Sequence, residues 1–107
     1  MYVELPLAPG HRIQGGRRPA VAVLSDAATK GNPMLMIVPL TSTLGTLRFP
    51  YTFQIDPSPT NGLTQPSVAL VFQLCAADRT HIEKVIGRLE DNYLQRLDKM
   101  LRDMLGL

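Results

Sequence analysis

The sequence predicts a mainly β domain that ends in one helix, and three observations support this fold class. Six short runs of β-branched and apolar residues are each bounded by glycine, proline, asparagine or aspartate, as strands are. The stretches between these runs carry turn signals. Near the C-terminus the apolar residues change from the period of a strand to that of a helix. Short strands at this spacing are typical of a small barrel or a sandwich.

The six predicted strands follow one another as Tyr2–Leu5, Ala20–Ser25, Met34–Thr41, Thr52–Asp56, Ser67–Leu74 and Val85–Leu89. The turn signals between them include "APGHRIQGG", "KGNP", "DPSPTNG" and "AADRTH". Pro39 lies inside the third run and has no N–H to donate to a neighbouring strand. That strand is therefore expected at a sheet edge, or irregular near its end.

The last segment predicts one amphipathic helix over Asn92–Leu105. Its apolar residues recur at steps of three and four, at Leu94, Leu97, Leu101, Met104 and Leu105. Asp91 is predicted as the N-cap, because its carboxylate can accept hydrogen bonds from the first free amides, and Gly106 is predicted to end the helix. The apolar stripe must cover either one end of a barrel or a second copy of the chain.

The composition predicts one folded domain over residues 1–107 and no metal or cofactor. A hydrophobic fraction of 45% and a charged fraction of 19% exclude the highly charged, disordered class. No apolar run approaches the roughly 20 residues of a membrane span, and "MYVELPLAPG" does not read as a signal peptide, so we expect a cytoplasmic protein with no membrane segment. His11 and His81 have no cysteine or carboxylate at ligand spacing. The apolar surroundings of Cys75 favour a small buried thiol over a nucleophile.

Positive charge is concentrated in the first half of the chain. Residues 1–50 hold five basic residues against two acidic ones, whereas residues 51–107 hold six against seven. Charge alone fits an ordinary solvated surface. The concentration of basic residues on turns between strands, as in "GGRRPAVAVLSD", favours an anionic partner such as nucleic acid.

Three segments, taken in order and spacing, resemble the MazF/PemK family of toxin–antitoxin ribonuclease toxins. They are "GHRIQGGRRPAVAVLS" (Gly10–Ser25), "MIVPLTST" (Met36–Thr43) and "LVFQLCAADRTHIEKVIGRL" (Leu70–Leu89). The resemblance implies an SH3-like β-barrel with a C-terminal helix that forms a homodimer and cleaves single-stranded RNA at short sequences without a metal. It also implies a cognate antitoxin whose acidic tail wraps the toxin.

The resemblance assigns candidate site residues. The expected catalytic residues are Arg18, Thr41 and His11. The expected RNA-binding residues are Gly16, Arg17, Ser42, Arg48 and Gln73. Recognition of the RNA sequence is expected from the loops Leu44–Pro50 and Asp56–Pro66.

These residue types suit metal-free RNA cleavage, in which the 2′-OH attacks its own phosphate and a 5′-OH leaves. Arg18 is always charged, and its planar fork matches a phosphate on which negative charge develops. The hydroxyl of Thr41 is a poor base, so its expected role is orientation. His11 is either the general acid or base, or an ordinary exposed loop histidine.

Departures from the family pattern leave two other functions open. Many members have a glutamate shortly before the Gly-x-Arg-Pro turn, where this chain has Arg12 or Ile13, and Cys75 replaces a frequent arginine. A catalytically degenerate barrel that binds RNA or antitoxin is therefore an alternative. Another is a gyrase-poison-like protein binder of the same fold. Such toxins use a Trp-containing C-terminal end, whereas this chain has no tryptophan and ends "MLGL".

Overall fold

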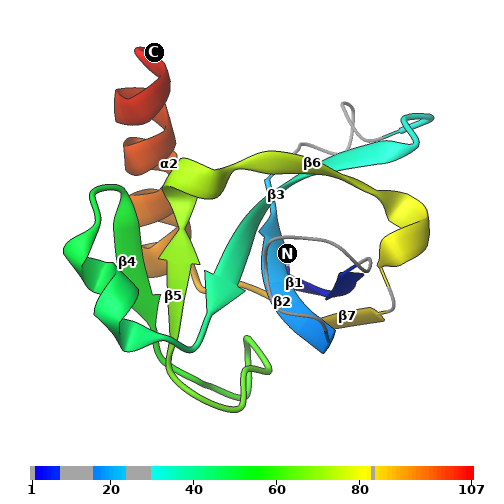
Figure 1. Cartoon of the computed structure of the whole chain (residues 1–107), viewed down its shortest axis with the longest axis horizontal. Helices are drawn as coiled ribbons and strands as arrows, with labels where there is room; N and C mark the ends of the chain where they lie inside the picture. Colours follow the sequence, from blue (N-terminus) through cyan, green and yellow to red (C-terminus); the bar gives the residue numbers. More distant parts are fainter. Residues whose placement is uncertain (1, 8–15, 24–29, 83) are drawn as a thin grey trace.

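The computed structural model describes residues 2–7, 16–23, 30–82 and 84–107. Its strands are β1 (Tyr2–Leu7), β2 (Gly16–Ala22), β3 (Met34–Thr41), β4 (Thr52–Ile55), β5 (Ser67–Leu70), β6 (Cys75–Asp78) and β7 (Lys84–Gly87). Three short 3-10 helices are η1 (Leu44–Arg48), η2 (Val71–Gln73) and η3 (Arg79–His81), and the chain ends in helix α2 (Asp91–Leu105). The mainly β fold with a C-terminal helix is as predicted (Figure 1).

The strands form one antiparallel sheet in the order β4-β5-β3-β2-β1-β7, with β6 also paired to β3. Within the described ranges the two outer strands of this order, β4 and β7, do not pair with each other, so backbone hydrogen bonds leave the sheet open. This arrangement remains consistent with the expected SH3-like fold. β1 pairs with β7 through Tyr2 and Glu4, which joins the first strand of the chain to the last.

The expectation that Pro39 marks an edge strand is wrong, because β3 is the central strand. Pro39 is buried and lies opposite Ala20 of β2. The other side of β3 is irregular, however. Residues Met34–Ile37 pair with β6, the last two residues of β3 pair with β5, and η2 separates these two partners. Pro39 therefore lies between two stretches of pairing, where a missing donor is tolerated.

The core lies between the sheet and α2, which packs beside β4 and β5 (Figure 1). The ring of Phe53 stacks on that of Tyr93 with centroids 6.2 Å apart, and Leu97 is the buried residue of the helix. The other buried members of this cluster are Val21, Val38, Leu40, Ile55, Leu63, Ala69, Val71 and Leu89. The apolar stripe of the helix thus packs on strands of its own chain, whereas the expected partner was one end of a barrel or a second copy.

Helix α2 differs from the prediction at its start and agrees at its end. The N-cap is Glu90 rather than Asp91, and Asp91 is the first helical residue, where its carboxylate pairs with Arg88 at 3.3 Å. Gly106 is left-handed, with φ of 75°, and its N–H bonds to the last carbonyls of the helix as predicted. Within the described part of the chain, no helix is both long and apolar enough to cross a bilayer.

Three predictions about the strands need correction. The run predicted as one strand over Ser67–Leu74 is a strand only to Leu70, since η2 bends the chain directly after it. The segment predicted as a turn, "AADRTH", contains most of β6, which pairs with Met34–Ile37. The second strand begins earlier than expected, at Gly16.

Candidate functional site

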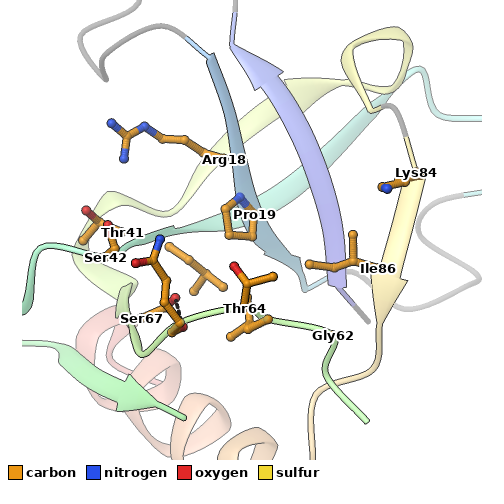
Figure 2. Close-up of a pocket in the computed structure, with 12 residues that line it drawn as sticks. Arg18, Pro19, Thr41, Ser42, Gly62, Thr64, Ser67, Lys84 and Ile86 are labelled. Carbon is orange, nitrogen blue, oxygen red and sulfur yellow. Dashed lines mark hydrogen bonds between the residues drawn. The ribbon is translucent and has the colours of Figure 1, made fainter. Parts of the chain in front are cut away.

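A cavity of about 510 Å³ opens where β2, the end of β3, the connection before β5 and β7 meet (Figure 2). The residues that line it are Arg18, Pro19, Leu40, Thr41, Ser42, Gly62, Leu63, Thr64, Gln65, Ser67, Lys84 and Ile86. One arginine, one lysine and five hydroxyl or amide side chains share this lining with apolar side chains of leucine, isoleucine and proline. Such a cavity suits a polar anionic ligand that also has an apolar face.

Arg18 reaches the cavity from β2, where its backbone lies opposite Leu5 of β1. Two residues further along β2, Ala20 and Val21 are almost completely buried, so the strand is anchored in the core just beyond the arginine. Arg18 itself is half-buried. A guanidinium keeps its charge at any physiological pH, so it presents a permanent cation with several N–H donors here.

Two hydroxyl groups stand near Arg18 at the end of β3. Figure 2 shows Thr41 and Ser42 on the same side of the cavity as the arginine. The Thr41 hydroxyl accepts a hydrogen bond from the backbone N–H of Thr43 at 3.2 Å. Because this bond uses a lone pair of the oxygen, the hydroxyl keeps its own proton to donate to a ligand.

The facing wall is formed by the connection before β5 and by β7. Thr64 and Gln65 come from the connection, and the Ser67 hydroxyl donates to the backbone carbonyl of Gln65 at 3.1 Å. Lys84 of β7 is exposed and lies across the cavity from Arg18 (Figure 2). Among the described residues that line the cavity none is acidic, so its field is positive and favours an anion.

The structure brings together some of the predicted site residues and not others. Arg18, Thr41 and Ser42 share the cavity. Gln73 of η2 and Arg48 of η1 are exposed outside it, and the Arg48 guanidinium lies 4.9 Å from the centroid of the Phe49 ring.

Three further predicted residues precede Arg18 in the chain. Gly16 and Arg17 belong to β2, opposite Leu7 and Pro6 of β1. His11 lies outside the described residues.

Sequence reasoning missed Lys84, Thr64 and Gln65 as individual residues. The segment of Thr64 and Gln65 was expected to recognise RNA only as part of a longer loop. No local motif marks Lys84, which reaches the cavity because β7 pairs with β1 and β1 pairs with β2. Pairing between distant strands was the missing information.

Cysteine and metal chemistry receive no support from the described residues. Cys75 is half-buried on β6, and burial raises the pKa of its thiol, so the neutral form dominates near pH 7. In the part of the chain that the structure describes, no three side chains of histidine, cysteine, aspartate or glutamate gather as a metal ion requires.

Comparison with known proteins gives a consistent result. A family model described as "PemK-like, MazF-like toxin of type II toxin-antitoxin system" matches residues 1–105. Endoribonuclease EndoA of Bacillus subtilis (strain 168) is 26% identical over 94 residues, which cover 88% of this chain and 80% of that protein.

Two solved structures share the fold. The Mycobacterium tuberculosis toxin MazF-mt6 aligns with a TM-score of 0.77 at 17% identity, covering 100% of this chain and 98% of that one. The MazE-MazF structure from Deinococcus radiodurans aligns with a TM-score of 0.76 at 23% identity, covering 99% of this chain and 92% of that one. At these identities the likeness establishes the fold alone.

Proposed function

Because the chain belongs to the PemK-like, MazF-like toxins of type II toxin–antitoxin systems, we propose that it is a metal-independent, sequence-specific endoribonuclease that cleaves single-stranded RNA. The observation that carries this proposal is the placement of Arg18, Thr41 and Ser42 around one positively charged cavity. The name of the Bacillus subtilis relative, an endoribonuclease, supports the same reaction class.

In the proposed reaction the 2′-OH of the RNA attacks the adjacent phosphorus, and the bond to the 5′-oxygen breaks. The products are a 2′,3′-cyclic phosphate and a 5′-OH end, so no water molecule is consumed in this step. Negative charge builds on the non-bridging phosphoryl oxygens. Arg18 stabilises that charge by charge-assisted hydrogen bonds from its guanidinium, the term that contributes most in such sites.

The neighbouring residues hold the RNA. Thr41 donates its hydroxyl proton to the phosphate or the 2′-oxygen, and Ser42 provides a second hydroxyl beside it. Lys84 binds a phosphate across the cavity, because a flexible ammonium matches phosphate as a point charge. Gly16, Arg17, Arg48 and Gln73 extend the RNA contacts beyond the cavity. His11 remains the proposed group for proton transfer.

One observation favours a second candidate, a barrel that binds RNA or antitoxin without cutting. The described lining of the cavity includes arginine, lysine and hydroxyl or amide groups, but no carboxylate or imidazole to accept the 2′-OH proton. Cleavage therefore depends on His11, or on charge stabilisation by Arg18 alone. Binding without cleavage is the expected behaviour if neither suffices.

The partners follow from the same proposal. A co-encoded antitoxin with an acidic tail fits a positively charged cavity, because an extended anionic peptide shares charge and apolar character with single-stranded RNA. One structural neighbour is a MazE-MazF structure, and this supports an antitoxin partner. We also propose a homodimer and a cytoplasmic location, where the RNA target is found.

The test is incubation of the purified protein with a long single-stranded RNA in EDTA, with breaks mapped by primer extension. Arg18→Ala is compared with Arg88→Ala, an arginine that is exposed and paired with Asp91 away from the cavity. Thermal unfolding checks that both variants fold. The proposal expects recurrent breaks at one short sequence, lost in Arg18→Ala and kept in Arg88→Ala. RNA that is bound but left intact by the wild type would favour the binding-only candidate.

A further inference from the structure

The connection between β4 and β5 contains a polar residue that is completely buried. Asn61 is 0% exposed, although asparagine is usually a surface residue. A buried polar side chain lowers stability unless its donors and acceptors are paired. Asn61 lies one residue before Gly62, at which this connection begins to line the cavity.

Every hydrogen-bonding position of the Asn61 side chain is used. Its Oδ1 accepts from the backbone N–H groups of Ser58 and Leu63, both at 3.0 Å. Its Nδ2 donates to the backbone carbonyl of Asp56 at 2.8 Å and to Oε1 of Glu90 at 3.1 Å. One side chain therefore links three points of the connection to the residue that precedes helix α2.

Glu90 completes the cluster from a distant part of the chain. Its Oε2 accepts from the Ser58 hydroxyl at 2.8 Å, and the oxygen of that hydroxyl accepts from the Asn61 backbone N–H at 3.1 Å. Burial alone raises the pKa of the Glu90 carboxyl, but hydrogen bonds from Ser58, its own backbone and Asn61 outweigh that effect, and the pKa is lowered. The carboxylate is therefore charged at neutral pH, and its hydrogen bonds are of the stronger, charge-assisted kind.

The backbone on both sides of Asn61 is packed directly against β7. A Cβ added to Gly62 would lie under 3.0 Å from the carbonyl oxygen and carbon of Ile86, and one added to Gly87 would meet the Asn61 carbonyl as closely. The Arg88 N–H also donates to the Thr60 carbonyl at 2.9 Å. The connection therefore has little room to move relative to β7, whose Ile86 lines the cavity.

We propose that the hydrogen-bonded cluster of Ser58, Asn61 and Glu90 is the positioning device that holds Thr64 and Gln65 in place to contact RNA. This inference rests on the proposed function. The cluster does not line the cavity, so its members are positioning residues and not catalytic ones. Gln65 carries both a donor and an acceptor, which is what hydrogen bonding to the edge of a nucleobase requires. Orientation of that amide relative to Arg18 then helps to select the RNA sequence that enters.

The test uses Glu90→Gln with Asp91→Asn as the matched control. Both replace a carboxylate by its amide, and Asp91 is the exposed neighbour of Glu90. The new NH₂ of Glu90→Gln must face the hydroxyl of Ser58 or the amide of Asn61, each of which already donates to Glu90. Ser58→Ala removes the hydroxyl contacts alone and is the second variant if Glu90→Gln does not fold.

Two readouts separate a positioning role from a general structural one. Hydrogen exchange of the Leu63 N–H, which donates to Asn61, should become faster while the amides of β3 keep their protection. The KM for a short RNA should rise roughly 10-fold to 100-fold with kcat changed far less, because Thr64 and Gln65 bind RNA while Arg18 acts on the phosphate. Asp91→Asn should change neither quantity.

The outcomes distinguish this inference from the proposed function. Wild-type protein that neither binds nor cleaves RNA would overturn the proposed function, and this inference with it. If the wild type cleaves RNA, and Glu90→Gln matches it in both hydrogen exchange at Leu63 and RNA cleavage, only the positioning role is overturned. The same conclusion follows if exchange at Leu63 becomes faster while KM and the cleaved sequence stay unchanged, or if kcat alone falls.

Discussion

Replacement of Gly62 by alanine tests how closely the connection before β5 is packed against β7. Two physical effects act at this position. The φ angle of Gly62 is 72°, in the left-handed region, where a Cβ costs about 1–2 kcal/mol. The added Cβ would also lie closer than 3.0 Å to the carbonyl of Ile86, and backbone cannot rotate away as a flexible side chain can.

A matched glycine separates the two effects. Gly31 has a φ of 74°, but a Cβ there would meet nothing within 4 Å. Alanine also reduces the conformational entropy of the unfolded chain, which stabilises the folded protein by about 0.4–1 kcal/mol and offsets part of the left-handed cost. Gly31→Ala should therefore destabilise the protein by only about 1 kcal/mol. Gly62→Ala carries the same conformational cost and must also move β7, with overpacking of about 1–3 kcal/mol and loss of the Arg88–Thr60 hydrogen bond of about 1 kcal/mol. We expect a total of about 3–5 kcal/mol.

The measurement is urea unfolding followed by far-ultraviolet circular dichroism, because the chain has no tryptophan for fluorescence. The free energy of unfolding should fall by at least about 2 kcal/mol more for Gly62→Ala than for Gly31→Ala, with the slope against urea unchanged. Equal losses for the two variants would mean that the connection yields freely. The account of close packing between Gly62 and Ile86 would then be refuted.

Three further predictions concern RNA binding, the core and acid stability. Lys84→Ala should make the plot of log RNA affinity against log salt concentration shallower by about 0.7, whereas Lys99→Ala, outside the cavity, should leave the slope unchanged. Phe53→Ala should lower the free energy of unfolding by about 3–5 kcal/mol in a urea titration, and a loss under about 1 kcal/mol would contradict the central place of this ring in the core. Burial alone raises the pKa of the Glu90 carboxyl, but hydrogen bonds hold that pKa below 4.5 in the folded protein. The contribution of the Glu90 carboxylate to stability is therefore complete above about pH 4.5 and is lost as the pH falls through the pKa of the folded state. In Glu90→Gln, the free energy of unfolding should therefore fall less steeply as the pH is lowered. The pH dependence that remains is expected from Asp78, whose pKa is lowered by the backbone N–H and hydroxyl of Thr80. If the loss of stability at low pH were the same in Glu90→Gln and the wild type, this would count against the Glu90 hydrogen bonds.

Elements with a strong local pattern could be predicted from the sequence. The bounds of β3 coincide with the predicted Met34–Thr41, and helix α2 starts one residue before the predicted Asn92. Their hydrophobic periods are complete within the segment itself. β6 could not be predicted this way, because "CAAD" has weak strand propensity and forms a strand through its pairing with β3.

The N-cap of α2 shows a second kind of limit. Asp91 has the favoured residue type for the position, yet Glu90 occupies it, and no side-chain cap hydrogen bond is formed. The carboxylate of Glu90 bonds instead to Ser58 and Asn61. These contacts with residues distant in the sequence override the local preference for aspartate at the N-cap. Nothing in the sequence of the helix indicates them.

The residues of the candidate site also fall into two groups, those that the sequence predicts and those that it does not. Arg18, Thr41 and Ser42 follow recognisable segments, and the structure places them around one cavity. Lys84 and Gln65 carry no motif, because their position depends on how β7 and the connection before β5 fold against the rest of the sheet. The roles of all these residues in RNA cleavage remain predictions.

The pairing of β1 with β7 has a consequence for the order of folding. β3 meets β5 and β6 after moderate chain separations, whereas Tyr2 must find Gly87 across most of the chain, and their short pairing contains a register shift. Loop-closure entropy therefore favours β7 as the last strand to join the sheet. Because Gly62 and Gly87 bring the connection before β5 and β7 into close contact, we expect these two segments to become ordered together. The cavity around Arg18 and Thr41 is then completed by Lys84 and Ile86 only late in folding.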